Sequence, residues 1–167
     1  MQSQAIVQAA DALLQPFSVG AVTHAPGRVE AVVRREDLCA AVKAIIDARW
    51  GYLSAITGLD HPWPKAAKPA AAPAEPPAEV MEDRLEALYQ FVSGAVVATL
   101  RVSVPYHDAR VPSVCGIIPS ATLYERELME MFGIVVEGTP DTGKLLLPDD
   151  WPDGVYPLRK SFKGLGQ

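Results

Sequence analysis

The chain has 167 residues, which is enough for one domain with a core of its own. Its net charge is −5 and 49% of its residues are hydrophobic, which argues against both a disordered chain and a protein whose main partner is nucleic acid. Its two cysteines, Cys39 and Cys115, are too few and too far apart for a zinc or iron–sulfur site, so we expect buried thiols.

The first third of the chain alternates between helical and strand patterns. Residues Gln4 to Leu14 repeat apolar side chains at helical spacing. A strand is predicted at Val29 to Val33, and a helix with one apolar stripe at Arg34 to Arg49. A second strand is predicted at Tyr52 to Thr57, with Gly58 ending it. Strand, helix and strand in this order indicate one βαβ unit.

The middle of the chain combines a linker with a hairpin. Residues 61–80 are rich in proline and alanine, which block helix and central strand, so we expect a linker or loop inserted within the domain. Two strand patterns follow, at Leu85 to Val92 and Ala95 to Val104. A two-residue turn at Ser93-Gly94 is expected to join them into a hairpin with one covered face.

A charged helix is predicted around residues 120–133, with its apolar stripe on Tyr124, Leu128, Met131 and Phe132. Arg126 and Glu130 fall on the opposite face. Glu125 and Glu127 are expected at the two edges of the stripe, neither in the core nor fully in water. Ser120, or Thr122 in a capping box with Glu125, would begin the helix. Gly133 is a natural residue to end it.

The two edge carboxylates leave three interpretations open. They are ordinary surface charges, or a general acid and base, or contacts at a docking surface. Paired acid–base chemistry needs a pocket and a strained or buried neighbour, and the sequence supplies no catalytic motif with either.

Residues 137–167, called the arm below, have no usable period because glycine and proline interrupt them throughout. The arm nevertheless carries large apolar side chains, and it is acidic up to Asp153 and basic from Val155 onward. Apolar anchors on an irregular segment predict that it folds on another protein, and the alternative is that it packs back on its own domain. The fold predicted is α/β (α+β): a small mixed β-sheet with packed helices in residues 1–136, followed by the extended arm.

Four motifs resemble the 30 kDa subunit family of respiratory complex I, which also includes the matching subunit of energy-converting membrane-bound [NiFe] hydrogenases. They are Glu125-Arg126-Glu127, Glu130-Met131-Phe132-Gly133-Ile134, Leu145-Leu146-Leu147-Pro148-Asp149-Asp150-Trp151 and Tyr156-Pro157-Leu158-Arg159-Lys160. The resemblance is close over Pro119 to Lys160 and loose over Val29 to Phe162. The family usually has aspartate at Glu130, histidine at Thr139, a basic residue or proline at Gly143, and often tryptophan at Leu123.

The resemblance implies a non-catalytic assembly subunit of a membrane-associated, energy-converting [NiFe] hydrogenase complex. The alternatives are a subunit of an NADH:quinone or F420H2-type oxidoreductase and, from the residues alone, a free-standing carboxylate enzyme using Glu125 and Glu127. No cofactor is expected in this chain. The resemblance implies that the nickel–iron site belongs to the large catalytic subunit, that small subunits hold iron–sulfur clusters, and that the complex lies peripherally on the cytoplasmic side of the membrane.

The residues expected to form the partner interface or its scaffold lie in the charged helix and the arm. They are Glu125, Arg126, Glu127, Gly133, Leu146, Trp151, Tyr156, Leu158, Arg159 and Lys160. Arg159 in particular is expected to support association with the large subunit more than the stability of its own domain. No run approaches the ~20 apolar residues needed to span a bilayer, so membrane contact is expected only through other subunits.

Overall fold

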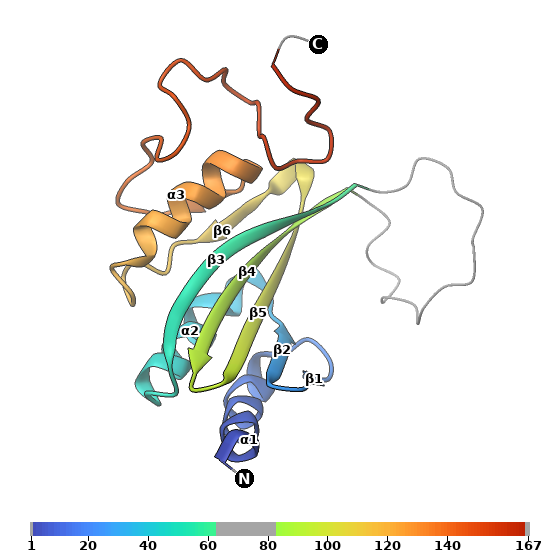
Figure 1. Cartoon of the computed structure of the whole chain (residues 1–167), viewed down its shortest axis with the longest axis vertical. Coiled ribbons are helices and arrows are strands. Elements are labelled where there is room, and N and C mark those ends of the chain that lie inside the picture. The colour runs from blue at the N-terminus through green and yellow to red at the C-terminus, as the bar shows by residue number, and fades with distance from the viewer. Residues whose placement is uncertain (1, 63–82, 166–167) are drawn as a thin grey trace, which may run out of the picture.

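A computed structural model describes residues 2–62 and 83–165. Three helices and two sheets make up this part of the chain (Figure 1). The helices are α1 (Gln2–Leu14), α2 (Leu38–Asp47) and α3 (Ala121–Phe132). The strands are β1 (Thr23–Ala25), β2 (Arg28–Val32), β3 (Tyr52–His61), β4 (Arg84–Ser93), β5 (Val96–Pro105), β6 (Arg110–Pro112) and β7 (Val135–Glu137). Single 3₁₀ turns cover Gln15–Phe17, Arg35–Asp37 and Tyr106–Asp108.

The main sheet has five strands in the order β1-β2-β5-β4-β3. Strand β2 runs parallel to β5, and β4 runs antiparallel to both of its neighbours, so β2 and β3 are parallel. The predicted βαβ unit is therefore present as β2-α2-β3, with the β4–β5 hairpin inserted between its two strands. The mixed sheet with packed helices confirms the predicted α/β class.

The core lies on one face of this sheet. Ile56, Tyr89 and Leu100 face each other across β3, β4 and β5, and each is at most 2% exposed. Cys39 of α2 and Glu125 of α3 both lie close enough to Tyr89 to affect its ionisation, which places both helices on this face. Gly58 lets α3 approach closely, because a Cβ there would lie 2.6 Å from the Phe132 ring.

Several predicted boundaries are wrong by a few residues. Strand β3 continues through Gly58 to His61, and the helix predicted from Arg34 begins its α-helical part only at Leu38. The hairpin turn is Gly94-Ala95 rather than Ser93-Gly94, because Ser93 still pairs with Val96. The predicted linker at residues 61–80 lies outside the described residues apart from its first two positions.

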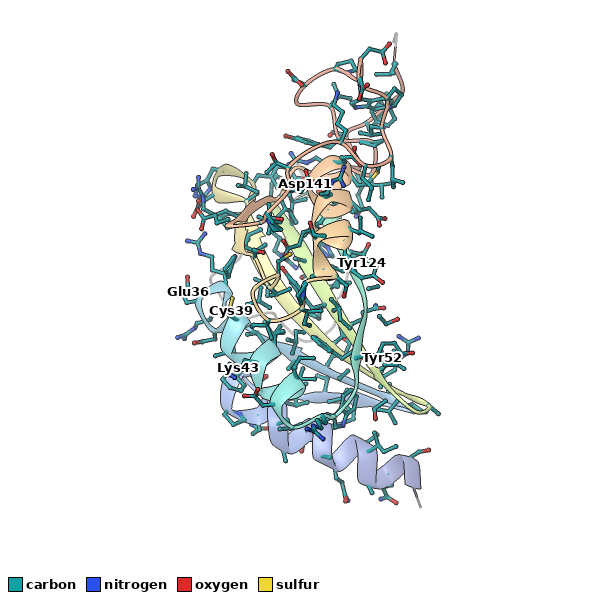
Figure 2. The ribbon with its side chains drawn as sticks, turned by 90° about the vertical axis from the view of Figure 1, so that its left-hand side faces the viewer. Glu36, Cys39, Lys43, Tyr52, Tyr124 and Asp141 are labelled. Atoms are coloured by element: carbon teal, nitrogen blue, oxygen red, sulfur yellow. The ribbon has the colours of Figure 1, made fainter. Side chains whose placement is uncertain are left out.

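Strands β6 and β7 form a second, two-stranded parallel sheet, and they flank α3 in the chain. The helix follows β6 and precedes β7, so its loops are fixed at the same small sheet. The arm leaves β7 and lies beside α3 at the end of the domain opposite α1 (Figures 1 and 2). No helix in residues 2–62 and 83–165 is long and apolar enough to cross a membrane.

Candidate docking surface

The side chain of Glu125 is fully buried, so the predicted position at the edge of the apolar stripe is wrong. Its carboxylate accepts hydrogen bonds from Ser113 Oγ at 2.8 Å, from the Val114 amide at 2.7 Å and from Cys115 Sγ at 3.2 Å. The loop after β6 turns its donors toward α3 and surrounds the carboxylate. Glu125 therefore joins this loop to α3 as a scaffold residue.

The capping box that the sequence offered at the start of α3 is absent. The residue before the helix is Ser120, and it makes no side-chain capping bond. Thr122, the other predicted start, is the second residue of the helix, so it cannot form a capping box with Glu125. At the other end, Gly133 ends the helix with φ of 67°, as the sequence predicts.

The ionisable groups around Glu125 are a phenol and two thiols whose pKa values are raised. Tyr89 is fully buried, and burial, with the nearby Glu125 carboxylate, raises the pKa of its hydroxyl. Burial likewise raises the pKa of the Cys115 and Cys39 thiols, so both remain protonated near neutral pH and are poor nucleophiles. Cys115 is buried as expected, whereas Cys39 is only half-buried.

The polar face of α3 binds the first half of the arm. Arg126 donates from Nε to the carbonyl of Gly143 at 2.8 Å and from Nη2 to the carbonyl of Lys144 at 2.7 Å. A third nitrogen, Nη1, lies 3.1 Å from a carboxylate oxygen of Asp141. One arginine therefore fixes three contacts of the arm, and its fork-shaped donor set suits this task.

One turn further along α3, the Glu130 carboxylate accepts backbone hydrogen bonds from the arm. The amide of Leu145 lies 2.6 Å from Glu130 Oε1, and the amide of Leu146 lies 2.9 Å from Oε2. The Leu147 amide makes a longer contact of 3.3 Å. Charge-assisted bonds to successive amides hold a segment that forms no helix or strand of its own.

The second half of the arm binds the end of α3 through Arg159. Its Nε donates to the carbonyl of Phe132 at 2.7 Å, and its guanidinium lies 4.5 Å and 5.0 Å from the ring centres of Tyr156 and Tyr106. Cation–π contacts with both rings hold the guanidinium against side chains of the same chain. The arginine expected to act mainly at a partner therefore makes these contacts within its own domain.

Asp60 completes this attachment from the end of β3. It is 5% exposed, accepts from the Tyr106 hydroxyl, and accepts from the backbone amide of Lys160 at 2.6 Å. The Leu158 amide donates to the carbonyl of Met131 at 3.2 Å. The arm thus packs on its own domain, which is the alternative that the sequence left open.

The arm also has contacts of its own. Lys144 Nζ donates to the carbonyls of Asp149 at 2.8 Å and Trp151 at 2.9 Å. Trp151 Nε1 donates to the carbonyl of Val155, and its ring lies 6.0 Å from that of Phe162. These contacts give a segment without helix or strand a defined shape.

The structure brings some of the predicted interface residues together and leaves others apart. Gly133, Tyr156, Arg159 and the backbone of Leu158 come together at the end of α3, whereas Glu125 lies apart in the core. The side chains of Leu146 and Leu158 remain 62% and 53% exposed. Sequence reasoning missed Glu130 and Asp60 as anchors. Glu130 stands within a motif that pointed to the family, whereas nothing local marks Asp60.

The described residues contain no group of three histidine, cysteine, aspartate or glutamate side chains that could hold a metal ion. Open cavities lie along the arm and beside the start of α2. One, of about 210 Å³, lies between α3 and the arm and includes Met129, Leu147 and Trp151. Another, of about 380 Å³, includes Arg35 and Cys39 among its lining residues. Neither brings together the groups of a hydrolytic or metal site.

Relatives with known roles match the chain over part of its length. An NADH-quinone oxidoreductase subunit of Chloroherpeton thalassium is 36% identical over 118 residues, which are 69% of this chain and 40% of the relative. Membrane-bound hydrogenase subunit beta of Pyrococcus furiosus is 45% identical over 64 residues, 38% of this chain and 37% of the relative. The chain therefore spans less than half the length of either.

A solved structure shares the fold over nearly the whole chain. It is that of the membrane-bound sulfane sulfur reductase, an archaeal respiratory membrane complex, with a TM-score of 0.69 and 24% identity. The match covers 99% of this chain and 88% of the solved one. The model of the family described as "Respiratory-chain NADH dehydrogenase, 30 Kd subunit" matches residues 31–167. The chain belongs to the 30 kDa subunit family of the respiratory-chain NADH dehydrogenase.

Proposed function

We propose that this chain is a non-catalytic assembly subunit of a membrane-associated, energy-converting [NiFe] hydrogenase complex. In this role it docks through the arm against the large catalytic subunit and helps to position the electron-transfer module. The observation that carries the proposal is the arm itself: its backbone is fixed to α3 while Leu146 and Leu158 stay in solvent. Exposed apolar side chains on an ordered segment can be buried against a partner at little cost in conformational entropy.

The proposal assigns the redox chemistry to neighbouring subunits. The chain would bind no cofactor, the large subunit would hold the nickel–iron centre, and small subunits would hold iron–sulfur clusters. This division agrees with the described residues, in which no group of three or more histidine, cysteine, aspartate or glutamate side chains could hold a metal ion. The complex would hold the chain peripherally at the cytoplasmic side of the membrane.

The second candidate is the corresponding subunit of an NADH:quinone or F420H2-type oxidoreductase. One observation favours it: the quinone oxidoreductase relative aligns with 69% of this chain, against 38% for the hydrogenase relative. Identity within the aligned part favours the hydrogenase, at 45% against 36%. The two candidates share the docking role and differ in the partner's active site.

Purification of the complex through an affinity tag on this chain tests the proposal. We expect the large subunit to co-purify, with nickel and iron in the eluate and hydrogenase activity. Iron with flavin and NADH or F420H2 oxidation, without nickel, would select the second candidate. Recovery of the tagged chain alone from detergent-solubilised membranes would reject both, and the Glu125→Gln/Glu127→Gln variant would then test for an activity of the isolated chain.

A further inference from the structure

Two leucines of the arm are exposed at places where the backbone is fixed. Leu146 is 62% exposed, and its amide is bound by Glu130. Leu158 is 53% exposed, and its amide is bound by the carbonyl of Met131. Because Glu130 and Met131 both belong to the last turn of α3, both leucines are anchored near the C-terminal end of this helix.

Exposure of these leucines is not a consequence of a loosely held arm. Trp151, Tyr156 and Phe162 in the same segment are partly buried, and Trp151 and Phe162 contact each other. The arm therefore places these aromatic residues inward and leaves three leucines exposed, Leu146, Leu158 and Leu165. The backbone is held by α3 at two of them, Leu146 and Leu158. Burying a leucine side chain is worth about 1.5–3 kcal/mol, so a fold that leaves both in water retains a considerable driving force for association.

The stretch of sequence between the two leucines is acidic. Asp149, Asp150 and Asp153 are exposed, and none of them forms an ion pair within the described residues. The nearest cation in the sequence, Lys144, is turned inward to the carbonyls of Asp149 and Trp151. Its charge is thus directed at the arm's own backbone rather than at these carboxylates.

We propose that the arm docks as a preformed element, with Leu146 and Leu158 entering apolar pockets on the partner and Asp149, Asp150 and Asp153 meeting lysine or arginine at their rim. The partner surface is then an apolar groove with a basic margin. This inference rests on the proposed function, which supplies the large subunit as the partner. It adds which side chains of the arm bind, and that the arm is already ordered before docking. An arm that is already ordered loses little conformational entropy on docking.

The fixed shape comes from two attachments of the arm. Arg126 and Glu130 hold residues 141–147, and Arg159 with Asp60 holds residues 156–160. The acidic stretch lies between these two attachments. A partner that met the arm in this shape would find the leucines and carboxylates at fixed positions, and charge at the rim would mainly accelerate association and set its register.

The test measures the affinity of the full-length chain for the large subunit of its own complex, co-produced and purified. We expect Leu146→Ser/Leu158→Ser to raise the Kd about tenfold or more, since one factor of ten corresponds to ~1.4 kcal/mol. The matched control is Leu123→Ser, which changes a leucine of 52% exposure in the first turn of α3. Its Kd is expected to stay within about twofold of wild type.

A second measurement tests the acidic rim. Wild-type affinity should fall as salt rises from about 0.05 to 0.5 M, and Asp149→Asn/Asp150→Asn/Asp153→Asn should remove most of this dependence. Asp11→Asn/Glu36→Gln/Asp47→Asn makes the same change of charge on α1, the 3₁₀ turn at Arg35–Asp37 and α2, and should leave the dependence intact.

Hydrogen exchange at the amides of Leu145 and Leu146 tests the preformed state. We expect these amides to be protected in the free chain as well as in the complex, because Glu130 binds them without a partner. Protection that arises only on binding would overturn the preformed docking. If the wild type binds and the Leu146→Ser/Leu158→Ser variant binds with the same Kd, the assignment of these leucines to the interface is wrong. A wild-type dimer that this variant dissociates would show that a second copy occupies the surface. No binding by the wild type would instead reject the proposed function.

Discussion

The ring of Tyr156 lies directly against Gly133, so closely that a Cβ on the glycine would come within 2.3 Å of the ring. Gly133 also has φ of 67°, a left-handed conformation that side chains other than glycine rarely adopt. The residue that ends α3 therefore serves twice: it terminates the helix and leaves room for the arm to return. Gly133 belongs to the motif at residues 130–134 and Tyr156 to the motif at residues 156–160, so two of the family motifs meet at this contact.

We predict that Gly133→Ala detaches the end of the arm. The substitution costs about 1 kcal/mol for the backbone conformation, and displacing Tyr156 adds the loss of its contacts with Arg159. Limited proteolysis and hydrogen exchange of residues 154–162 should both accelerate, while exchange in β4 stays unchanged.

Gly154→Ala is the matched control for this experiment. Gly154 has φ of 74°, close to that of Gly133, but nothing lies within 4 Å of a Cβ built there. The control therefore carries the backbone cost without the collision. Equal acceleration in both variants would show that the Tyr156 contact contributes nothing.

The sequence predicts the local features of this site and misses the distant ones. Leu128, Met131 and Phe132 are buried as the helical period requires, and Gly133 ends the helix as its residue type suggests. Such features depend on neighbours within a turn. The contact between Asp60 and the amide of Lys160 joins residues separated by 100 positions, and no periodicity carries that information.

Glu125 shows a second limit of pattern reasoning. A carboxylate at the margin of an apolar stripe is expected in or near water, because an uncompensated buried charge is costly. Three donors in the loop at residues 113–115 compensate it here, and they belong to no repeating pattern. The shape of the arm is equally hard to predict from the sequence. It depends on hydrogen bonds from backbone amides, which carry no residue-specific signal.

We predict that Glu125→Ala strongly destabilises the domain. The change leaves the Val114 amide and the Ser113 hydroxyl without their buried acceptor, and each unsatisfied group costs about 1–3 kcal/mol. Urea unfolding should show a loss of roughly 3 kcal/mol or more. Glu127→Ala, on a half-exposed residue of the same helix, should change the free energy of unfolding by about 0.5 kcal/mol or less. Similar losses for both variants would contradict the scaffold role.

We predict that Arg159→Ala loosens the arm even when no partner is present. The variant removes the bond to the Phe132 carbonyl and both ring contacts, and it should destabilise the isolated chain by about 2 kcal/mol. Hydrogen exchange should rise in residues 156–162. Lys163→Ala changes an exposed cation of the same segment and serves as the control. Unchanged exchange and stability, together with lost partner binding, would return Arg159 to the interface role that the sequence suggested.

We predict that acid weakens the junction between the 3₁₀ turn at Arg35–Asp37 and the 3₁₀ turn at Tyr106–Asp108. Arg35 donates to Asp108 at 2.6 Å, and this bond holds the pKa of the Asp108 carboxyl below its ordinary value of 3.8. A carboxyl with a lowered folded-state pKa contributes stability that is present above its unfolded pKa and is lost as pH falls through the folded value.

The contribution of Asp108 should therefore be complete at neutral pH and disappear only below about pH 3.8. Titration of the Asp108 carboxyl by NMR should give a midpoint under this value in the wild type and a higher midpoint in Arg35→Gln. Lys43→Gln, which removes the partner of Asp47 on α2, should leave the Asp108 midpoint in place. A midpoint for Asp108 that does not respond to Arg35→Gln would show that this contact does not form in solution.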